Sequence, residues 1–523
     1  MKHTAAASER GTTDRRLPGS SRRWRRLRQA TQVLALLLFL YLLLGTRQGN
    51  TTPLPRDLFF RLDPLAAISA MLASRTWITP LALAGVTLLL TVAAGRAWCS
   101  WLCPLGTLLD WTPARSPDED KPDTHSRWRH VKSSLFLATL LAAGLGSLTL
   151  LVLDPITLLF RTLAGFFLPF FSTSVSRMES WLYGIGALQG PLEKLDGLAR
   201  GWLLTEQPFF LPSVVFLAVF AGVLALNAVR RRFWCRYLCP LGGLLGLVSG
   251  VTQLRHRVND NKCTSCGRCS PLCPTGAIDP GRNFAASMAE CTLCLDCVEA
   301  CPTGAISFSG QWRLPQTRRY DPSRQQLLAS LGAAAVGAVF LRLVPPSATA
   351  RSQLVRPPGS TESSLLSQCI RCGECTKVCP TGAIQPSSSA GDLQSLWTPR
   401  LNTRLGYCDY SCNSCGQVCP TGAITKLSLE RKNETVIGIA RIDKDRCIPW
   451  AEGRECIVCE EMCPVPEKAI VLEDEAVEGR TVRCPSVVNE LCIGCGICEC
   501  RCPVAGVAAV RVLAPGLGGE NSV

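Results

Sequence analysis

Histidine is scarce in this sequence. Only four of the 523 residues are histidines, His3, His125, His130 and His256. They show no spacing typical of axial haem ligands, and the haem-attachment pattern C-x-x-C-H does not occur. The sequence therefore predicts no haem in this chain.

Basic residues interleaved with aromatic residues are lacking too. Lysine and arginine outnumber aspartate and glutamate by 55 to 40, but much of the excess lies in short clusters beside apolar runs, such as Arg230, Arg231 and Arg232. A nucleic-acid-binding face would spread basic residues over a folded surface with aromatic residues between them. No nucleic-acid partner is therefore predicted, and the clusters are typical of membrane topology signals.

Apolar residues, in contrast, are abundant and gathered in long runs. They make up 47% of a chain that is too long for one domain. Four runs predict membrane spans, and a shorter fifth run predicts another apolar segment; they cover residues 30–45, 78–95, 133–153, 211–229 and 327–341. Lysine and arginine crowd before the first run, between the second and third, and after the fourth. By the positive-inside rule these segments face the cytoplasm.

The fifth run allows two interpretations. It is followed by Ala348-Thr349-Ala350 and preceded by Arg318-Arg319, which partly match a cleavable export signal of the twin-arginine type. An uncleaved anchor and a cleaved signal both remain open. In either case the remainder of the chain lies outside, in the periplasm of a bacterium with two membranes, and the protein belongs to the inner membrane.

These patterns predict a multidomain chain with an α-helical membrane bundle and two α+β domains of the bacterial ferredoxin type. The expected parts are a basic cytoplasmic tail (1–29), a four-span membrane domain (30–250), a cytoplasmic two-cluster ferredoxin domain (251–312), a linker with the fifth apolar segment (313–350) and a periplasmic four-cluster ferredoxin domain (351–523).

Cysteine is the most informative residue, with 30 copies. The bacterial ferredoxin run C-x2-C-x2-C-x3-C-P occurs four times, and two looser quartets accompany it. The four full runs are Cys263, Cys266, Cys269, Cys273; Cys291, Cys294, Cys297, Cys301; Cys369, Cys372, Cys375, Cys379; and Cys492, Cys495, Cys498, Cys502. The looser ones are Cys408, Cys412, Cys415, Cys419 and Cys447, Cys456, Cys459, Cys463. About six 4Fe-4S clusters are expected.

The spacing also predicts which cysteines share a cluster. Three thiolates two residues apart surround one cluster, while the fourth, set off by proline, reaches the neighbouring cluster. Cys301 is therefore expected to complete the set begun by Cys263, and Cys273 the set begun by Cys291. For the four outer motifs we predict nesting, first with last and second with third. Zinc and disulfides fit this dense spacing poorly.

The motif CPTGAI, which starts at Cys273, Cys301, Cys379 and Cys419, predicts the local structure beside each cluster. Its proline stops the local helix, its glycine permits a close turn, and its alanine and isoleucine are expected to pack beside the cluster.

Two further patterns repeat in the membrane part. Leu62-Asp63-Pro64-Leu65 returns as Leu153-Asp154-Pro155-Ile156, and the stretch 98–106 returns at 234–242, which indicates two similar halves. Asp63 and Asp154 are candidates for accepting a quinol proton, but Asp-Pro is also a common helix cap. The second repeat carries two C-x3-C-P pairs, Cys99 with Cys103 and Cys235 with Cys239. With i, i+4 spacing each pair is expected on one helical face, as an extra four-thiolate site or as free thiols.

Residues 30–310 resemble the membrane ferredoxin NapH of periplasmic nitrate reductase systems, on the two C-x3-C-P pairs and the two ferredoxin motifs that follow them. Residues from about 320 to 510 are similar to exported ferredoxins of the NapG and MauM type, on four cluster motifs that include the stretch CDYSCNSC at 408–415. The chain thus resembles a fusion of the two. Cys484 and Cys500 match no motif.

That resemblance implies a quinol dehydrogenase component. Quinol from the membrane quinone pool would be the substrate, and a periplasmic cytochrome c or reductase the acceptor. The two cytoplasmic clusters leave a donor in the cytoplasm open as the electron source. An assembly or maintenance factor for a periplasmic metalloenzyme is the rival of a different class.

Overall fold

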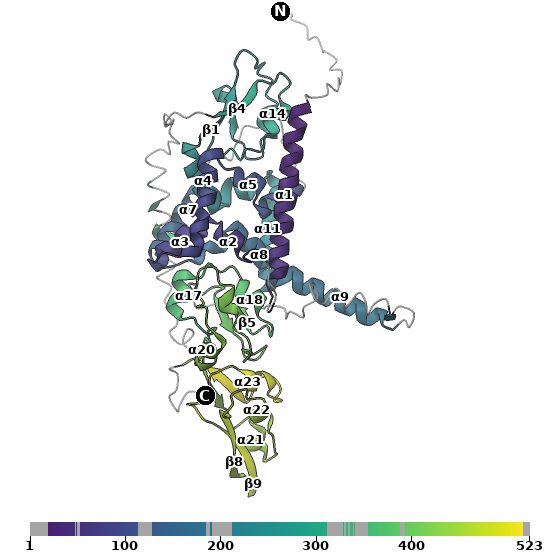
Figure 1. Cartoon of the computed structure of the whole chain (residues 1–523), viewed down its shortest axis with the longest axis vertical. Coiled ribbons are helices and arrows are strands. Elements are labelled where there is room, and N and C mark those ends of the chain that lie inside the picture. The colour runs from purple at the N-terminus through teal and green to yellow at the C-terminus, as the bar shows by residue number, and fades with distance from the viewer. Residues whose placement is uncertain are drawn as a thin grey trace, which may run out of the picture.

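The computed structural model describes residues 19–47, 49, 53–112, 128–184, 189–190, 212–310, 354–387, 393–477 and 479–515, with a few more between 328 and 339. Most of the tail predicted at 1–29, and nearly all of the linker with the fifth apolar run, lie outside the described residues. The described parts form one elongated column, with a small cysteine-rich domain at one end, a helical part in the middle and the later cysteine-rich segments at the other end (Figure 1).

The helical part consists of two halves that follow the internal repeat. The first half contains α1 (Gly19–Gly45), α2 (Leu58–Arg61), α3 (Pro64–Ser74), η1 (Thr79–Leu83), α4 (Ala84–Ala94), α5 (Ala97–Trp101) and α6 (Pro104–Trp111). The second contains α7 (Arg129–Gly144), η3 (Thr149–Leu153), α8 (Pro155–Thr162), η4 (Leu163–Phe167), α9 (Leu168–Leu182), α11 (Ser213–Val229), η6 (Trp234–Leu238), α12 (Pro240–Val248) and η7 (Ser249–Val251). Each Asp-Pro starts α3 or α8, and each Cys-Pro starts α6 or α12, since proline suits the first helical position.

Two helices are long and apolar enough to cross a membrane, among the described residues: Arg23–Gly45 and Pro155–Leu182. The first contains the predicted span 30–45. The other three predicted spans form shorter helices, such as α7 with 16 residues and α11 with 17. A 17-residue helix is about 26 Å long, which is less than the roughly 30 Å hydrocarbon core. The second half of Pro155–Leu182, α9, runs sideways from the column rather than along α1 (Figure 1).

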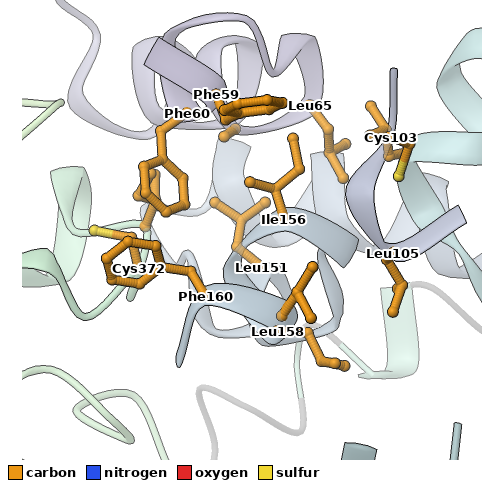
Figure 2. Packing of buried hydrophobic residues seen from close by; sticks show 14 of the residues in the cluster. Phe59, Phe60, Leu65, Cys103, Leu105, Leu151, Ile156, Leu158, Phe160 and Cys372 are labelled. Atoms are coloured by element: carbon orange, nitrogen blue, oxygen red, sulfur yellow. The ribbon is translucent and has the colours of Figure 1, made fainter. Parts of the chain in front are cut away.

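One hydrophobic core runs through the helical part and reaches beyond it. Phe60, Leu65, Ile156 and Phe160 are almost fully buried in it, and Cys372 of the outer segment belongs to the same cluster. Figure 2 shows Cys372 beside Phe60 and Phe160, with Cys103 on the other side of Leu65. The helical part and the first outer motif are therefore packed as one body.

The cysteine-rich segments are α+β, as predicted, with short helices and two-stranded antiparallel sheets. The first contains β1 (Leu254–Val258), α13 (Cys269–Leu272), β2 (Ile278–Asp279), η8 (Pro280–Arg282), β3 (Ala285–Ala286), α14 (Asp296–Ala300) and β4 (Ile306–Gly310). The outer one contains α17 (Glu362–Gln368), α18 (Glu374–Val378), β5 (Ile384–Pro386), β6 (Pro399–Leu401), α19 (Ser414–Gln417), α20 (Leu429–Glu434), β7 (Ile439–Ile442), α21 (Ile448–Glu452), α22 (Val458–Glu461), β8 (Ile470–Val477), β9 (Arg480–Val487), α23 (Ile497–Arg501) and β10 (Val510–Leu513). The pairs are β1–β4, β2–β3, β5–β6, β7–β10 and β8–β9.

A buried ion pair joins the two halves of the helical part. Arg232 donates from Nη2 to Asp110 Oδ2 at 2.7 Å and from Nε to Oδ1 at 2.8 Å, and its side chain is fully buried. Removing one partner of such a pair leaves an uncompensated buried charge. We expect Asp110→Ala to lower the free energy of unfolding by about 3–5 kcal/mol, measured by denaturation in detergent. Arg483→Ala, which breaks an exposed pair with Glu455, is the control and should change it by less than about 1 kcal/mol; equal effects would contradict the argument.

Candidate iron–sulfur sites and the helical core

The first cysteine-rich domain, residues 254–310, which we call the cytoplasmic-type domain after its predicted location, gathers its eight motif cysteines into two separate cavities. Cys263, Cys266, Cys269 and Cys301 line one, together with Phe284 and Ile306. Cys273, Cys291, Cys294 and Cys297 line the other. These are the two sets that exchange of the fourth cysteine predicts. Because β1 precedes the first motif and β4 follows the second, their pairing closes the domain around both cavities.

The outer cysteines are grouped differently from the predicted nesting. Cys375 interacts electrostatically with Cys369, Cys419 and Cys415, and Cys415 with Cys408, Cys379 and Cys412. Farther along, one cavity is lined by Cys447, Cys456, Cys459 and Cys502, and another by Cys463, Cys492, Cys495 and Cys498. The first motif thus pairs with the second, and the third with the last, so the nested pairing is wrong.

The reason for this grouping lies in the strands that flank the motifs. β7 precedes the third motif and β10 follows the last one, and the two pair antiparallel from Val510 opposite Ile442 to Leu513 opposite Ile439. They close residues 439–513 into a unit with the same plan as the cytoplasmic-type domain. The third and last motifs, which are neighbours in the sequence, therefore share their two cysteine sets, whereas nesting would pair the first motif with the last.

The CPTGAI turn has the local structure that its residues predict. All four glycines have positive φ, from 59° at Gly276 to 74° at Gly422. The alanine and isoleucine that follow are almost fully buried in every copy, as at Ala383 and Ile384. In the first two copies the alanine N–H donates to the motif cysteine at 3.2 Å, from Ala277 to Cys273 and from Ala305 to Cys301. Such N–H···S bonds tune a cluster's potential.

The cavities suit iron–sulfur clusters in their donor set and their surroundings. Each has four sulfurs and a mostly apolar wall, such as Ala440, Ile470 and Val512 around the site of Cys492. Among the described residues, no three His, Cys, Asp or Glu side chains are close enough to hold a single metal ion. A four-iron cluster lies between its four cysteine ligands, so their sulfur atoms are farther apart than those around a single metal ion. Burial raises the pKa of Cys447 and Cys495 to about 11, so metal binding at these sites would release protons.

The observed grouping can be tested with one cysteine. In Cys463→Ala, the set of Cys492, Cys495 and Cys498 loses its fourth ligand, whereas the set of Cys447 keeps all four. We expect the cluster signal assigned to the Cys492 set by isotope-edited Mössbauer spectroscopy to be lost or converted, with the other signals unchanged. Cys484→Ala is the control, because Cys484 lines neither cavity. Loss of the signal of the Cys408 set instead would support nesting.

The two C-x3-C-P pairs come together in the helical part. Cys239 interacts electrostatically with Cys235, Cys99 and Cys103, and all four are buried; we call them the helical quartet. Their predicted position on one helical face is wrong. Cys103 and Cys239 have extended ψ values, 117° and 111°, and cap the next helix, because the residue before proline is driven out of the helical region.

Buried charged side chains surround the helical quartet, and the sequence interpretation missed them. Arg96 and Arg232 are fully buried, and each precedes the first cysteine of its pair by three residues. That shared position in the two repeats is a signal that could have identified them. Glu290 accepts from Arg96 at 3.0 Å and from Lys132 at 2.7 Å, which ties the cytoplasmic-type domain to this site.

Asp63 and Asp154 lie together, fully buried in the helical part, and we call them the Asp pair. One oxygen of each caps its helix: Asp63 Oδ1 accepts from Leu65 N at 2.9 Å, and Asp154 Oδ2 accepts from Ile156 N at 2.9 Å. Helix capping is therefore confirmed. The other two oxygens, Asp63 Oδ2 and Asp154 Oδ1, are buried without a hydrogen-bond partner among the described residues, and the two carboxyl groups interact electrostatically with each other. Because two neighbouring buried carboxylates repel each other, the pair is expected to hold a proton.

The Asp pair is close to the first outer motif. Arg161, on α8, donates from Nη1 to the carbonyl oxygen of Arg371 at 3.2 Å, and Arg371 Nη2 donates to Thr149 Oγ1 at 3.3 Å. Arg161 also lies over the ring of Trp397, 4.1 Å from its centroid. These contacts hold the loop of Cys372 against the helix that Asp154 starts.

Comparison with protein families finds iron–sulfur domains along the chain. A model described as "4Fe-4S dicluster domain" matches residues 368–423, which contain the first two outer motifs together. A "4Fe-4S binding domain" model matches 256–279 and 287–307. A second model with that description matches 76–115, 212–258 and 415–433, the first two of which contain the C-x3-C-P pairs.

Several curated proteins are similar to parts of the chain. The methylamine utilization ferredoxin-type protein MauM of Methylorubrum extorquens is 34% identical over 210 residues, covering 38% of this chain and 94% of MauM. The ferredoxin-type protein NapG of Escherichia coli is 35% identical over 204 residues, 38% of this chain and 87% of NapG. The methylamine utilization ferredoxin-type protein MauN of M. extorquens is 25% identical over 269 residues, 48% of this chain and 75% of MauN. No solved structure matches.

Proposed function

Because the chain belongs to the family of ferredoxin-type proteins that includes MauM and NapG, we propose that it is a membrane-bound electron-transfer protein that oxidises quinol and delivers electrons to a periplasmic acceptor. The family relationship rests on about 38% of the chain. The remaining helical part acts, in this proposal, as the NapH-type membrane component to which the exported ferredoxin is fused. A periplasmic cytochrome c or reductase of a nitrate-reductase-like system receives the electrons.

A membrane position for the helical part is supported by what its outer surface exposes. Leu34 on α1, Leu89 on α4 and Val214 on α11 are 66%, 71% and 70% exposed, although all are large and apolar. Large apolar side chains exposed to this extent are more stable against lipid than against water. The four helices α1, α4, α7 and α11 form the proposed four-span bundle, with thinning of the bilayer around the shorter ones.

The proposed orientation has the first ferredoxin domain in the cytoplasm and the outer one in the periplasm. The two lie at opposite ends of the helical part (Figure 1). Arg231 and Arg232 lie at the end that carries the first ferredoxin domain, where Arg231 is 3.8 Å from Asp296. This agrees with the positive-inside rule.

The observation that carries quinol oxidation is the buried Asp pair beside the first outer motif. Oxidising quinol releases two electrons and two protons, and a buried carboxyl pair with one site free can accept these protons one at a time, passing the first to water outside before it takes the second. Phe60, whose carbonyl oxygen accepts from the backbone N–H of Asp63 at 3.3 Å, packs in the same core as Cys372. The iron–sulfur clusters, when bound to the cysteine sets, supply one-electron transfer. The chain's own residues contribute the proton acceptor, which is the Asp pair, and the hydrophobic core that keeps water from it.

The test is anaerobic addition of a quinol analogue to the full chain in lipid vesicles, followed by EPR of the reduced clusters. Reduction by the quinol analogue is expected. Clusters that stay oxidised with quinol, yet are reduced by a reduced soluble ferredoxin, would exclude quinol as the donor.

That second outcome would fit the alternative function, a conduit from a cytoplasmic donor. The conduit from a cytoplasmic donor is favoured by the close contact between the cytoplasmic-type domain and the helical part. Arg28 on α1 donates to Asp296 at 3.0 Å, and Trp101 Nε1 donates to the carbonyl oxygen of Leu293 at 3.0 Å. A domain held this closely is suited to exchanging electrons with the helical part. A direct path from quinol to the periplasm would not need the clusters of this domain.

A further inference from the structure

The outer cysteine sets follow one another in a row that begins at the helical part. The set of Cys369 and Cys372 lies against the helical part, because Cys372 belongs to its hydrophobic core. Cys375 of the same set interacts electrostatically with Cys415, which belongs to the set of Cys408. The first two outer sets are therefore neighbours, and the first of them is the one that adjoins the helical part.

The row continues into the unit formed by residues 439–513. Cys408 N donates to the carbonyl oxygen of Cys495 at 2.7 Å, and Cys495 belongs to the set of Cys492. Cys498 of that set interacts electrostatically with Cys459, which lines the next cavity. That cavity is the last in the row, and we call its four cysteines the exit set: Cys447, Cys456, Cys459 and Cys502.

The exit set lies at the end of the column that is farthest from the helical part. α21, which starts directly after Cys447, lies at that end together with β8 and β9 (Figure 1). We infer that electrons leave the chain from the exit set and pass there to a soluble one-electron carrier with a basic surface. This inference rests on the electron-transfer part of the proposed function, not on quinol oxidation. In each transfer one electron passes from the exit set to the carrier, which is reduced, and no bond forms or breaks.

Apolar side chains are exposed beside the exit set. Ile457, next to Cys456, is 37% exposed, and Val507 is 53% exposed. Arg446, next to Cys447, donates from Nη2 to the carbonyl oxygen of Val507 at 3.2 Å, which places Val507 beside the exit set. A protein interface has an apolar core within a polar rim, and these side chains are suited to form that core.

The surface near Ile457 is acidic. From Glu452 to Glu475 the chain has eight acidic residues and two basic ones, and seven of the acidic residues are exposed. The whole chain, in contrast, has 55 lysines and arginines and 40 acidic residues. A negative surface attracts a positively charged partner and increases its association rate. The acidic residues therefore favour a basic carrier over an acidic one.

Zero-length crosslinking tests the docking surface without any electron transfer. The oxidised full chain in detergent is treated with a carbodiimide in the presence of a basic c-type cytochrome, and the crosslinked peptides are identified by mass spectrometry. Crosslinks from lysines of the cytochrome to acidic residues between Glu452 and Glu475 are expected, and high salt should abolish them. Crosslinks that map only to acidic residues elsewhere in the chain would overturn the inference.

Electron transfer tests the same surface in a second way. The full chain is reduced with dithionite, freed of excess reductant and mixed with the oxidised cytochrome in a stopped-flow instrument. Ile457→Lys/Val507→Lys is expected to lower the second-order rate constant at least about 10-fold, because it places positive charge where the basic partner docks. Leu429→Lys is the matched control, since Leu429 on α20 is exposed to a similar extent, at 40%, and its variant should keep the rate. Equal rates for the two variants would contradict docking at the exit set.

A ligand variant tests the exit itself. Cys459→Ser removes one cysteine of the exit set and is expected to abolish transfer to the cytochrome, while the EPR signals of the other ferredoxin sets remain. Unchanged transfer would place the exit at another set. If this variant loses the other signals too, the lysine double variant and the crosslinks decide. A chain that dithionite cannot reduce would contradict the proposed function itself, whereas a reduced chain whose transfer neither variant affects overturns only this inference.

Discussion

Replacing both members of the Asp pair, as Asp63→Asn/Asp154→Asn, is expected to slow quinol-driven reduction of the clusters by at least about 100-fold, because a positioned general base contributes about 10²–10⁴. Asparagine is as good a helix cap as aspartate, so the starts of α3 and α8 should be retained. What the variant loses is the capacity to accept a proton. Stopped-flow absorbance in vesicles, with a quinol analogue as donor, gives the rate.

Two comparisons separate this role from a structural one. Reduction of the same variant by dithionite should be unchanged, since it needs no proton acceptor in the helical part. Asp57→Asn is the matched control: Asp57 is also buried, but it is paired with Arg61 at 2.8 Å, and its variant should keep most of the quinol rate. Equal losses with quinol and dithionite would mean that the variant is damaged, and an unaffected quinol rate would remove the Asp pair from the reaction.

Infrared spectroscopy tests directly whether the Asp pair holds a proton. A protonated carboxyl group absorbs at a frequency distinct from that of a carboxylate, so the unaltered chain should show a buried carboxylic-acid band. This band should lose intensity in the double variant and shift in D₂O, and the intensity that remains is expected from Glu374, because burial raises the pKa of that carboxyl group to about 8. If the double variant loses no intensity, the Asp pair holds no proton.

The sequence predicted much of the local chemistry because that chemistry is encoded locally. The turn at Gly276, the burial of Ala277 and the exchange between Cys273 and Cys301 each depend on a few neighbouring residues. The Asp-Pro starts of α3 and α8 were predictable for the same reason.

The errors lie where distant segments meet. Nesting of the outer motifs failed because the pairing of β7 with β10 decides the grouping, and four-residue strands leave little trace in a sequence. The i, i+4 spacing of the C-x3-C-P pairs predicts one helical face, but Pro104 and Pro240 drive the cysteine before them out of the helical region. The two members of the Asp pair come from different repeats, and neither repeat alone indicates that they lie side by side.

Removing iron is expected to unfold the outer cysteine-rich segment while the helical part remains folded. The outer hydrophobic core contains mostly small or medium side chains, such as Ala440, Ile470 and Val512, and cysteines make up much of the rest, among them Cys463 and Cys492. Its strands pair only in twos, and such small domains depend on metal for stability. The helical core, in contrast, is built from phenylalanine and leucine, with T-shaped ring pairs such as Phe39 with Phe59 at 5.2 Å.

Hydrogen exchange measured by mass spectrometry, before and after treatment with a chelator and oxidant, would show the difference. Amides of β7 and β10 should lose most of their protection, and those of α3 and α8 should keep it. Cys484→Ala serves as control, because it removes a buried thiol from β9 without removing a proposed ligand, and its protection with iron present should match the unaltered chain. If β7 and β10 stay protected after iron is lost, the apolar side chains alone are sufficient, and the cysteine sets contribute to electron transfer but not to folding.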